Sequence, residues 1–279
     1  MQNSQNEHQE TIAGFGDEWS RFDQSGAQAE ELERTFNRYF AVFPWDALAE
    51  GARGIDVGCG TGRWARLVAP RVGRLDCVDA SREALAVATR NLSEAKNVSL
   101  ALASVGRLPF ETGTFDFGYS LGVLHHVPDT QAAIRECVRV LKPGAPFLLY
   151  LYYALDNRPA WFRAAWRASD LLRRFVSRMP HGMRHVVADA VATGVYWPLA
   201  RTARLGEQLG FDVSGLPLSA YREHGLYIMR NDALDRLGTQ LEQRFSRVEI
   251  QTMMQSAGLN EIRFHEDFPF WCAVGIKAG

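Results

Sequence analysis

The sequence is poor in cysteine and has no excess of charge of either sign. It contains only four cysteines in 279 residues, with no CxxC pair and no spacing typical of metal ligands. We therefore expect neither a disulfide framework nor a metal site, and interpret all four as reduced thiols. Cys77, Cys137 and Cys272 are expected to pack as small buried hydrophobes, while Cys59 lies in a glycine-rich loop with no obvious activating base beside it. Because 31 basic and 32 acidic residues give a formal net charge of -1, we expect no overall attraction to nucleic acid or to an anionic membrane.

Targeting signals and long apolar runs are also missing. The first ten residues hold no Lys or Arg and no apolar core, unlike a secretory signal peptide, and we expect a loose tail there. The rather apolar run 186–200 contains Asp189, Gly194 and Pro198, so it is too short and too broken for a membrane-spanning helix. These features favour a cytoplasmic location. With 47% hydrophobic residues, the chain can form one large domain or a domain with a sizeable insertion.

What the sequence does contain is a regular alternation of strand-like and helix-like segments between residues 50 and 153. This order predicts parallel strands joined by crossover helices. The predicted strands are 54–57, 74–79, 98–103, 115–120 and 146–153. The predicted helices between them are 63–69, 82–92 and 130–141. Later in the chain, the capping box Ser246-Arg247-Val248-Glu249 predicts a helix to residue 257, followed by strands at 261–265 and 270–277.

The segment before the first strand has two parts. Apolar residues at helical spacing predict a helix over 27–43. The aromatic segment 15–19 before it is predicted to be a loop or a short turn. Its Trp19 has two interpretations, a side chain that closes over a ligand pocket or a plain packing anchor.

A glycine-rich loop, Asp56-Val57-Gly58-Cys59-Gly60-Thr61-Gly62, follows the first predicted strand. Glycines permit a tight turn and the close approach of a ligand to the backbone. The spacing is GxGxG and not the GxGxxG of dinucleotide-binding loops, since Arg63 stands where the third glycine would be. A carboxylate at Asp56 suits a ligand with a cationic amine better than a pyrophosphate, which it would repel.

Asp79 ends the second predicted strand. A carboxylate at this place can accept hydrogen bonds from both ribose hydroxyls of a bound nucleoside. The alternative is an acid that stabilises the start of the next helix beside Ser81. Both roles are compatible with the position.

These motifs, taken in order, resemble those of the class I S-adenosylmethionine-dependent methyltransferases. The resemblance is also carried by segments 108–110 (LPF), 115–116 (FD), 123–129 (VLHHVPD) and 139–144 (RVLKPG). The part from 108 to 144 resembles the branch that includes quinone and sugar methylases. The resemblance implies an α/β fold, a doubly wound, seven-stranded, mostly parallel sheet with helices on both faces and a reversed last strand. It also implies S-adenosylmethionine as cofactor and S-adenosylhomocysteine as product.

The resemblance further implies which residues bind the cofactor. The glycine loop should wrap its methionine part, with Asp56 near the amine, and Asp79 should hold the ribose. Segment 103–105 should meet the adenine, and Ser120 and Leu121 should pass beside the sulfonium. The implied contacts are Asp56, Gly58, Cys59, Gly60, Gly62, Asp79, Ala80, Ser104, Val105, Ser120 and Leu121. Ser104 departs from the usual pattern, because the family commonly has Asp there, and a hydroxyl accepts a hydrogen bond without charge.

Methyl transfer from a sulfonium is an in-line displacement, so the protein mostly has to align the acceptor. An oxygen acceptor also needs its proton removed. His125 and His126 follow the fourth predicted strand and are our first candidates for a base or an acceptor contact, with a purely structural role as the alternative. Tyr153 is a further catalytic candidate. Other residues that can face an acceptor are Tyr152, Asp156, Tyr221, Glu223 and His224.

The alternation stops after Tyr153, which predicts four parts: an N-terminal tail and helical lid (1–49), a cofactor-binding core (50–153), a helical insertion (154–245) and a closing part of the core (246–279). Between Arg158 and Arg204 there are nine arginines, two aspartates and no lysine or glutamate, a local balance of +7. One interpretation of the insertion is a cap over the acceptor pocket with a solvated arginine face. The other is a basic amphipathic surface that rests on a membrane and gives access to a lipid or lipid-linked acceptor.

The favoured function is methylation of a small molecule such as a natural product, a sugar or a quinone-like compound, with an oxygen acceptor preferred. Two alternatives stay open from the sequence alone. One is a nicotinamide-dependent oxidoreductase. The other is a binding module that keeps the cofactor pocket without catalysis.

Overall fold

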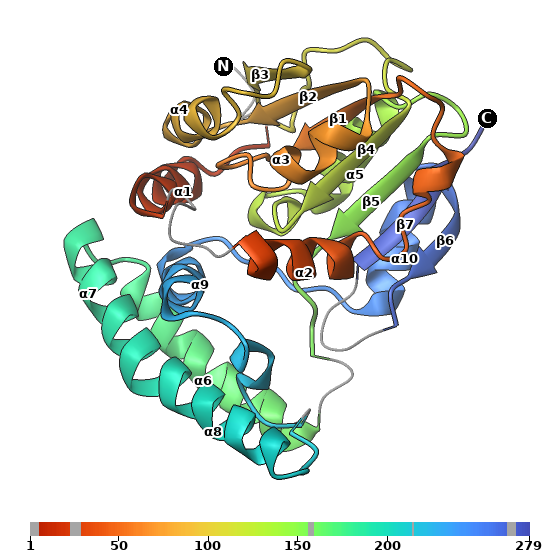
Figure 1. The fold of residues 1–279 in the computed structure, drawn as a ribbon. Helices are drawn as coiled ribbons and strands as arrows, with labels where there is room; N and C mark the ends of the chain where they lie inside the picture. The colour runs from red at the N-terminus through yellow and green to blue at the C-terminus, as the bar shows by residue number, and fades with distance from the viewer. Residues whose placement is uncertain (1–5, 23–28, 156–158, 214, 267–271) are drawn as a thin grey trace. The chain divides into compact units, whose positions relative to one another are not determined.

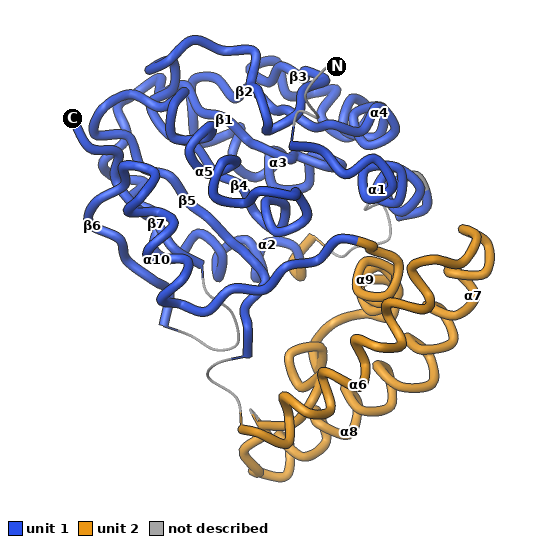
Figure 2. The backbone as a smooth tube through the Cα atoms, turned by 180° about the vertical axis from the view of Figure 1, so that it is seen from behind, with its two compact units in different colours: residues 1–23, 32–156, 241–279 blue, residues 24–31, 157–240 orange. Residues whose placement is uncertain are grey.

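The computed structural model describes residues 6–22, 29–155, 159–213, 215–266 and 272–279. The chain forms two compact units, which Figure 2 shows in different colours. Unit 1 comprises residues 1–23, 32–156 and 241–279, and unit 2 comprises residues 24–31 and 157–240. Unit 1 contains the strands, and unit 2 is built from helices.

Unit 1 is built around a seven-stranded sheet with the strand order β3-β2-β1-β4-β5-β7-β6 (Figure 1). Strands β1 to β5 pair in parallel, whereas β7 runs antiparallel to both β5 and β6. The strands are β1 Arg53–Val57, β2 Arg74–Asp79, β3 Val98–Leu102, β4 Phe117–Leu121, β5 Pro146–Tyr150, β6 Leu259–Phe264 and β7 Cys272–Lys277. The predicted doubly wound fold with a reversed last strand is confirmed.

Helices cover both faces of this sheet, because successive strand residues point to opposite sides. On one face Ile55 and Phe147 pack with α5 and α10, and on the other Phe117 and Tyr119 pack with α2, α3 and α4. Parallel sheets need this two-sided cover, which keeps their strands buried. The helices that contribute to unit 1 are α1 Gln9–Arg21, α2 Ala29–Tyr39, α3 Ala65–Val68, α4 Arg82–Asn91, α5 Thr130–Arg139 and α10 Arg247–Ser256.

Side-chain caps fix where α4, α5 and α10 begin. Ser81 accepts a backbone N–H at the start of α4, and Asp129 does so at the start of α5. At α10 the predicted capping box is present, since Ser246 Oγ accepts the Glu249 N–H and Glu249 Oε2 accepts the Ser246 N–H. These contacts satisfy amide groups that have no partner within the helix.

The prediction of a loop over 15–19 is wrong, because these residues lie inside α1, which also includes the end of the predicted tail. His8 caps this helix by accepting a backbone N–H. Glycines within the segment lower its helix propensity and hid it from sequence reasoning. The helix is stabilised by packing against α4. Gly16 permits the close approach, since a Cβ there would lie 3.0 Å from both Ser81 Oγ and Glu83 Oε2.

Several element boundaries also differ from the prediction. Helix α3 has only four residues in place of 63–69 and passes into a 3-10 turn, because Pro70 lacks the N–H that an α-helix needs. Strand β5 ends at Tyr150, which pairs with the first residue of β7, and Tyr153 forms an isolated bridge with Phe245. Helix α2 is shorter than predicted. The predicted residues 27–28 and 270–271 lie outside the described residues.

Unit 2 consists of helices that pack around α9. Helices α6 and α7 and a π-helical turn all contact α9, and Glu31 contacts His224 and the Gly225 N–H within the same unit. No sequence pattern indicated that residues 24–31 belong with this unit. Its elements are α6 Ala160–Val176, α7 His181–Val191, the π turn Ala192–Tyr196, α8 Trp197–Gln208 and α9 Leu226–Gly238. Within the described ranges, no helix has both the length and the apolar character needed to span a membrane.

Candidate functional site

The loop after β1 turns through three glycines with positive φ. The angle is 79° at Gly58, 53° at Gly60 and 77° at Gly62, a backbone region that residues with a Cβ rarely adopt. A Cβ at Gly58 would lie 2.4 Å from Val123 Cγ1, whereas the nearest atoms to a Cβ at Gly60 are those of the Trp19 ring, at 3.5 Å. The loop thus presents bare backbone, which fits a ligand that approaches it closely.

Asp79, at the end of β2, braces this loop. Its Oδ2 accepts the Gly60 N–H at 2.8 Å, and its Oδ1 accepts the Ser81 N–H at 2.9 Å. Burial raises the pKa of this carboxyl group, while the backbone hydrogen bonds act in the opposite direction. Ala80 is partly buried beside it. Asp79 therefore connects the glycine loop to the start of α4.

Asp56 lies on β1, one residue before the strand ends, and only 2% of its surface is exposed. Its Oδ2 accepts a hydrogen bond of 2.9 Å from the Tyr119 hydroxyl on the neighbouring strand β4. Burial raises the pKa of Asp56 to about 8, although the hydrogen bond lowers it. The carboxyl group is therefore mostly protonated at pH 7, and a cation placed beside it would favour the ionised form.

The four cysteines are free and buried, as expected. Cys59 in the glycine loop and Cys77 on β2 interact through their thiols, and this contact together with burial raises the pKa of Cys59 well above its ordinary value. The thiolate is the nucleophilic form of cysteine. Cys59 is thus a neutral packing residue of the loop.

The segment predicted to meet the adenine follows β3. The Ala103 N–H donates to the carbonyl oxygen of Asp79 at 2.9 Å, which places the segment beside the end of β2. Ser104 Oγ accepts the Gly106 N–H at 3.2 Å and so closes a turn, and Val105 is buried. The segment is ordered by backbone contacts next to Asp79.

Ser120 and Leu121 end β4 at the same edge of the sheet. Both are buried. Ser120 Oγ donates to the carbonyl oxygen of Val57 at 2.8 Å, and Val57 is the last residue of β1. The Ser120 hydroxyl therefore ties β4 to the residue that precedes the glycine loop.

Helix α1 contacts the segments that follow three strands. Its Gly16 approaches Ser81 after β2, and its Trp19 lies on Gly60 after β1. Its Phe15 packs edge-on against the His126 ring after β4, with ring centroids 4.9 Å apart. Trp19, predicted either to cover a pocket or to anchor packing, thus lies on the glycine loop itself.

The two histidines form a 3-10 turn after β4 and differ in their surroundings. His125 is fully buried and stacks on Tyr152 with ring centroids 3.8 Å apart, and neither of its ring nitrogens hydrogen bonds to a described residue. Burial lowers the pKa of His125 well below its ordinary value. His126 is 5% exposed, and its Nδ1 lies 2.8 Å from the carbonyl oxygen of Leu241. Because a carbonyl only accepts, Nδ1 carries the hydrogen and Nε2 is the basic nitrogen of the neutral ring.

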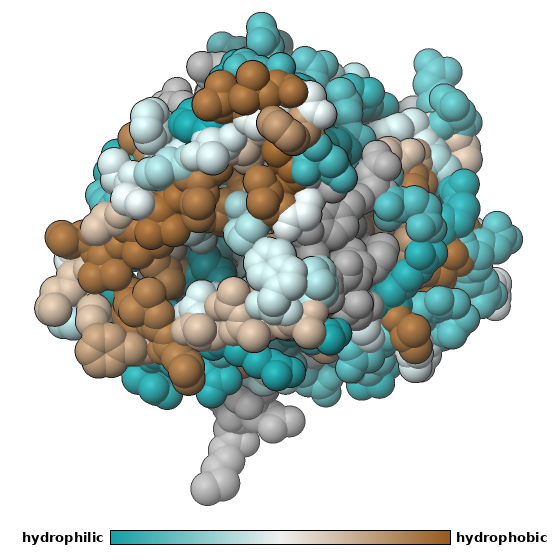
Figure 3. Space-filling view, turned by 90° about the horizontal axis from the view of Figure 1, so that it is seen from below, coloured by the Kyte–Doolittle hydropathy of each residue, from teal (hydrophilic) through white to brown (hydrophobic). Residues whose placement is uncertain are grey.

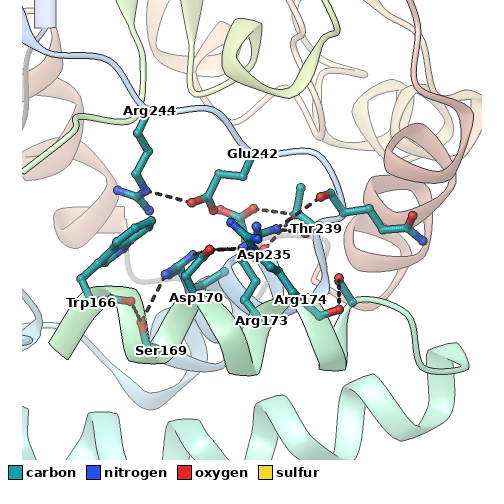
Figure 4. Close-up of polar contacts among 12 residues, drawn as sticks. Trp166, Ser169, Asp170, Arg173, Arg174, Asp235, Thr239, Glu242 and Arg244 are labelled. Atoms are coloured by element: carbon teal, nitrogen blue, oxygen red, sulfur yellow. Dashed lines mark hydrogen bonds and ion pairs between the residues drawn. The ribbon is translucent and has the colours of Figure 1, made fainter. Parts of the chain in front are cut away.

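Arg244 joins this cluster to the residues after β5. Its guanidinium carbon lies 5.1 Å from the centroid of the Tyr152 ring, and its Nη1 donates to the Tyr153 carbonyl oxygen at 3.2 Å. Glu242 accepts from Arg244 Nε at 2.9 Å, as Figure 4 shows. The structure therefore brings His125, His126 and Tyr152 together, whereas Tyr153 takes part through its backbone.

Of the other acceptor candidates, Tyr221, Glu223 and His224 belong to unit 2. Asp156 falls outside the described residues. Tyr221 and His224 contact each other within unit 2, with ring centroids 5.7 Å apart, and Glu223 there is exposed. In the described part of the chain, no group of three or more His, Cys, Asp or Glu could hold a metal ion.

Sequence reasoning missed Tyr119, Arg244 and the face of α1 that carries Phe15 and Gly16. A signal for Tyr119 was available, because a tyrosine in a buried strand needs a hydrogen-bond partner for its hydroxyl. Arg244 had no such signal, since it is far in sequence from the strands whose ends it joins.

A family model described as a methyltransferase domain matches residues 55–149. The ubiquinone biosynthesis O-methyltransferase of Xanthomonas oryzae pv. oryzae (strain PXO99A) is 32% identical over 184 residues, which cover 65% of this chain and 73% of the relative. The corresponding enzyme of Xanthomonas campestris pv. campestris (strain B100) has the same identity and coverage.

Solved structures share the fold at low sequence identity. One is the putative methyltransferase of Haloferax volcanii, solved in complex with the Trm112 activator, with a TM-score of 0.52, 16% identity, and coverage of 95% of this chain and 98% of that chain. Another is a putative S-adenosylmethionine-dependent methyltransferase from Methanococcus maripaludis, with a TM-score of 0.51, 14% identity, and coverage of 100% and 98%.

A first prediction concerns how tightly the glycine loop is packed. Gly144 has a φ of 80° with nothing within 4 Å of a built Cβ, whereas Gly58 combines a φ of 79° with the Val123 contact. We expect Gly144→Ala to lower the free energy of unfolding by about 1–2 kcal/mol through backbone strain alone. Gly58→Ala should lower it by about 1–3 kcal/mol more, because Val123 must move. Urea denaturation measures both, and equal losses would contradict the tight packing of the loop.

Proposed function

Because this chain belongs to the class I S-adenosylmethionine-dependent methyltransferases, we propose that it methylates a hydroxyl oxygen of a small aromatic acceptor of the quinone type. The methyl donor is S-adenosylmethionine, and the alternative function of a nicotinamide-dependent oxidoreductase is therefore excluded. Support for an oxygen acceptor comes from the O-methyltransferases that are 32% identical to this chain. Further support comes from the arrangement of His126, which carries the proposal.

The residues around the glycine loop fit the cofactor. The bare backbone at Gly60 accommodates close approach, and the mostly protonated carboxyl of Asp56 can ionise against the ammonium group of the methionine part. We assign the ribose to Asp79 and the adenine to Ser104 and Val105, as the resemblance implies. When bound, the cofactor supplies an electrophilic methyl group on a good leaving group, so the protein mainly has to align the acceptor.

His126 is the residue we propose as the general base. Its Nδ1–H is held by the Leu241 carbonyl oxygen, which orients the ring and leaves Nε2 as the atom that takes the acceptor's proton. Phe15 of α1 packs on the same ring, and α1 also covers the glycine loop through Trp19. One helix thus contacts both the proposed base and the cofactor loop. Tyr153 stays a prediction as a catalytic residue, because its hydrogen bond with Arg244 is made by its backbone carbonyl oxygen.

The choice of acceptor atom is tested with three model acceptors of similar size, a catechol, an aniline and a 1,3-diketone, which offer oxygen, nitrogen and carbon. With isotope-labelled methyl donor, we expect label on a catechol oxygen, identified by mass spectrometry. Label on the aniline nitrogen or on the diketone carbon would contradict the proposal. If labelled product forms neither from the three model acceptors nor from compounds in cell extracts, a non-catalytic binding module is favoured.

The role of His126 is tested by a matched pair of variants. His126→Phe keeps the aromatic packing but removes the base, and we expect kcat to fall by about 10²–10⁴-fold. In the parent protein we expect kcat to rise with increasing pH, and in His126→Phe we expect this rise to be lost. His125→Phe keeps the stacking on Tyr152 and should leave kcat close to that of the parent protein. Binding of S-adenosylhomocysteine by calorimetry serves as the folding control for both. A full pH-dependent rise of kcat in His126→Phe would rule out this histidine as the base.

A further inference from the structure

Helix α6 differs from an ordinary surface helix, because charged and polar side chains lie on its inner face and most of its apolar side chains are exposed. Its inward residues include Asp170, Arg173 and Ser177, all buried. Most of its apolar residues face away from the rest of unit 2, and Leu171 and Phe175 are 69% and 66% exposed, whereas Val176 is buried. The exposed apolar positions recur at helical spacing and form a continuous stripe. They are Trp161, Ala164, Ala165, Ala168, Leu171, Leu172 and Phe175.

Ion pairs and helix-end carbonyls explain the polar interior. Asp170 accepts from Arg173 Nε at 2.7 Å, and Arg173 Nη1 donates to the carbonyl oxygen of Thr239 at 2.8 Å (Figure 4). Arg184 on α7 donates to the Gly238 carbonyl oxygen at 3.1 Å. Basic side chains thus satisfy carbonyls at the C-terminal end of α9, where cations are favoured. These contacts fix the orientation of α6 and leave its apolar stripe outside.

The exposed apolar surface continues on the next two helices. Of the 16 exposed large hydrophobic residues among those the structure describes, 14 lie between Trp161 and Leu226. We name the exposed apolar side chains of α6, α7 and α8 the outer apolar face. In Figure 3 apolar residues gather into a broad brown area on the surface. Apolar patches of this kind mark interaction sites. The large members of this face are Trp161, Leu171, Leu172, Phe175, Met183, Val186, Trp197, Leu199 and Leu205.

Positive charge accompanies this face. Arg163, Arg167, Arg174 and Arg178 are all exposed on or just after α6, and Arg174 also pairs with Asp170. Tryptophans stand near the first residues of α6 and of α8, at Trp161 and Trp197. A helix with an apolar stripe, flanking arginines and tryptophans is typical of binding in the interface of a bilayer.

We propose that the outer apolar face is a docking surface for an anionic lipid bilayer. Charge complementarity favours this occupant over a second copy of the chain. In a twofold dimer the same patch meets itself, so two arginine-rich patches would be brought together, and like charges across an interface are unfavourable. Anionic headgroups instead attract the arginines while the apolar stripe enters the boundary of the acyl chains. The inference is independent of which acceptor atom is methylated.

The test is flotation of the full chain with vesicles in a density gradient. The vesicles contain phosphatidylglycerol and phosphatidylethanolamine, or phosphatidylcholine alone as the neutral control. We expect flotation with the anionic vesicles at low salt and release at about 0.5 M salt, where exposed charges are screened. Leu172→Asp/Phe175→Asp and Arg163→Glu/Arg167→Glu should each weaken partitioning at least about tenfold.

Matched variants outside unit 2 control for general effects of charge. Val248→Asp changes an exposed valine on α10, and Arg34→Glu/Arg90→Glu changes two exposed arginines of α2 and α4. Both should float like the parent protein, and thermal unfolding of every variant reports whether it folds. No flotation at low salt, equal flotation with neutral vesicles, or a stable dimer by light scattering that Leu172→Asp/Phe175→Asp disrupts would overturn the proposal.

Discussion

The site depends on a buried carboxyl group held between two central strands. Asp56 on β1 and Tyr119 on β4 are register partners, and their hydrogen bond of 2.9 Å lies two residues before Gly58. Two further side chains fix the same region, since Ser120 binds the Val57 carbonyl oxygen and Asp79 binds the Gly60 N–H. Low local polarity strengthens such contacts and makes an unpaired group costly. The end of β1 is thus rigid, and it contains an acid whose pKa of about 8 makes it responsive to a nearby cation.

A second constraint is that the glycine loop has no Cβ atoms at the positions where a ligand would approach its backbone. Gly58 is packed against Val123, while the atoms nearest to a Cβ at Gly60 are those of the Trp19 ring of α1. The same helix contacts His126 through Phe15 and approaches Ser81 through Gly16. Helix α1 therefore contacts both the glycine loop and the histidine that we propose as the base.

Much of unit 1 could be predicted because its signals are local. Apolar runs, the capping box at Ser246 and the GxGxG loop each specify their own segment, and the sheet with its reversed last strand was implied by the family resemblance. The failures lie where tertiary contacts override local preference. Helix α1 contains glycines and forms against α4, and Arg244 reaches the cluster from a segment distant in sequence. In unit 2 the composition showed the arginine excess, but only the fold shows that Asp170, Arg173 and Arg184 turn inward and the apolar stripe outward.

The most direct test of this account is the proton balance of cofactor binding. Calorimetric titration with S-adenosylhomocysteine at pH 7, in buffers of different ionisation enthalpy, measures the protons exchanged. Because Asp56 is mostly protonated before binding and should ionise against the ligand's ammonium group, we predict release of up to about one proton and an affinity that rises from pH 6 toward pH 8. Asp56→Asn should abolish this release. Binding without proton release, with an affinity that Asp56→Asn leaves unchanged, would contradict the account.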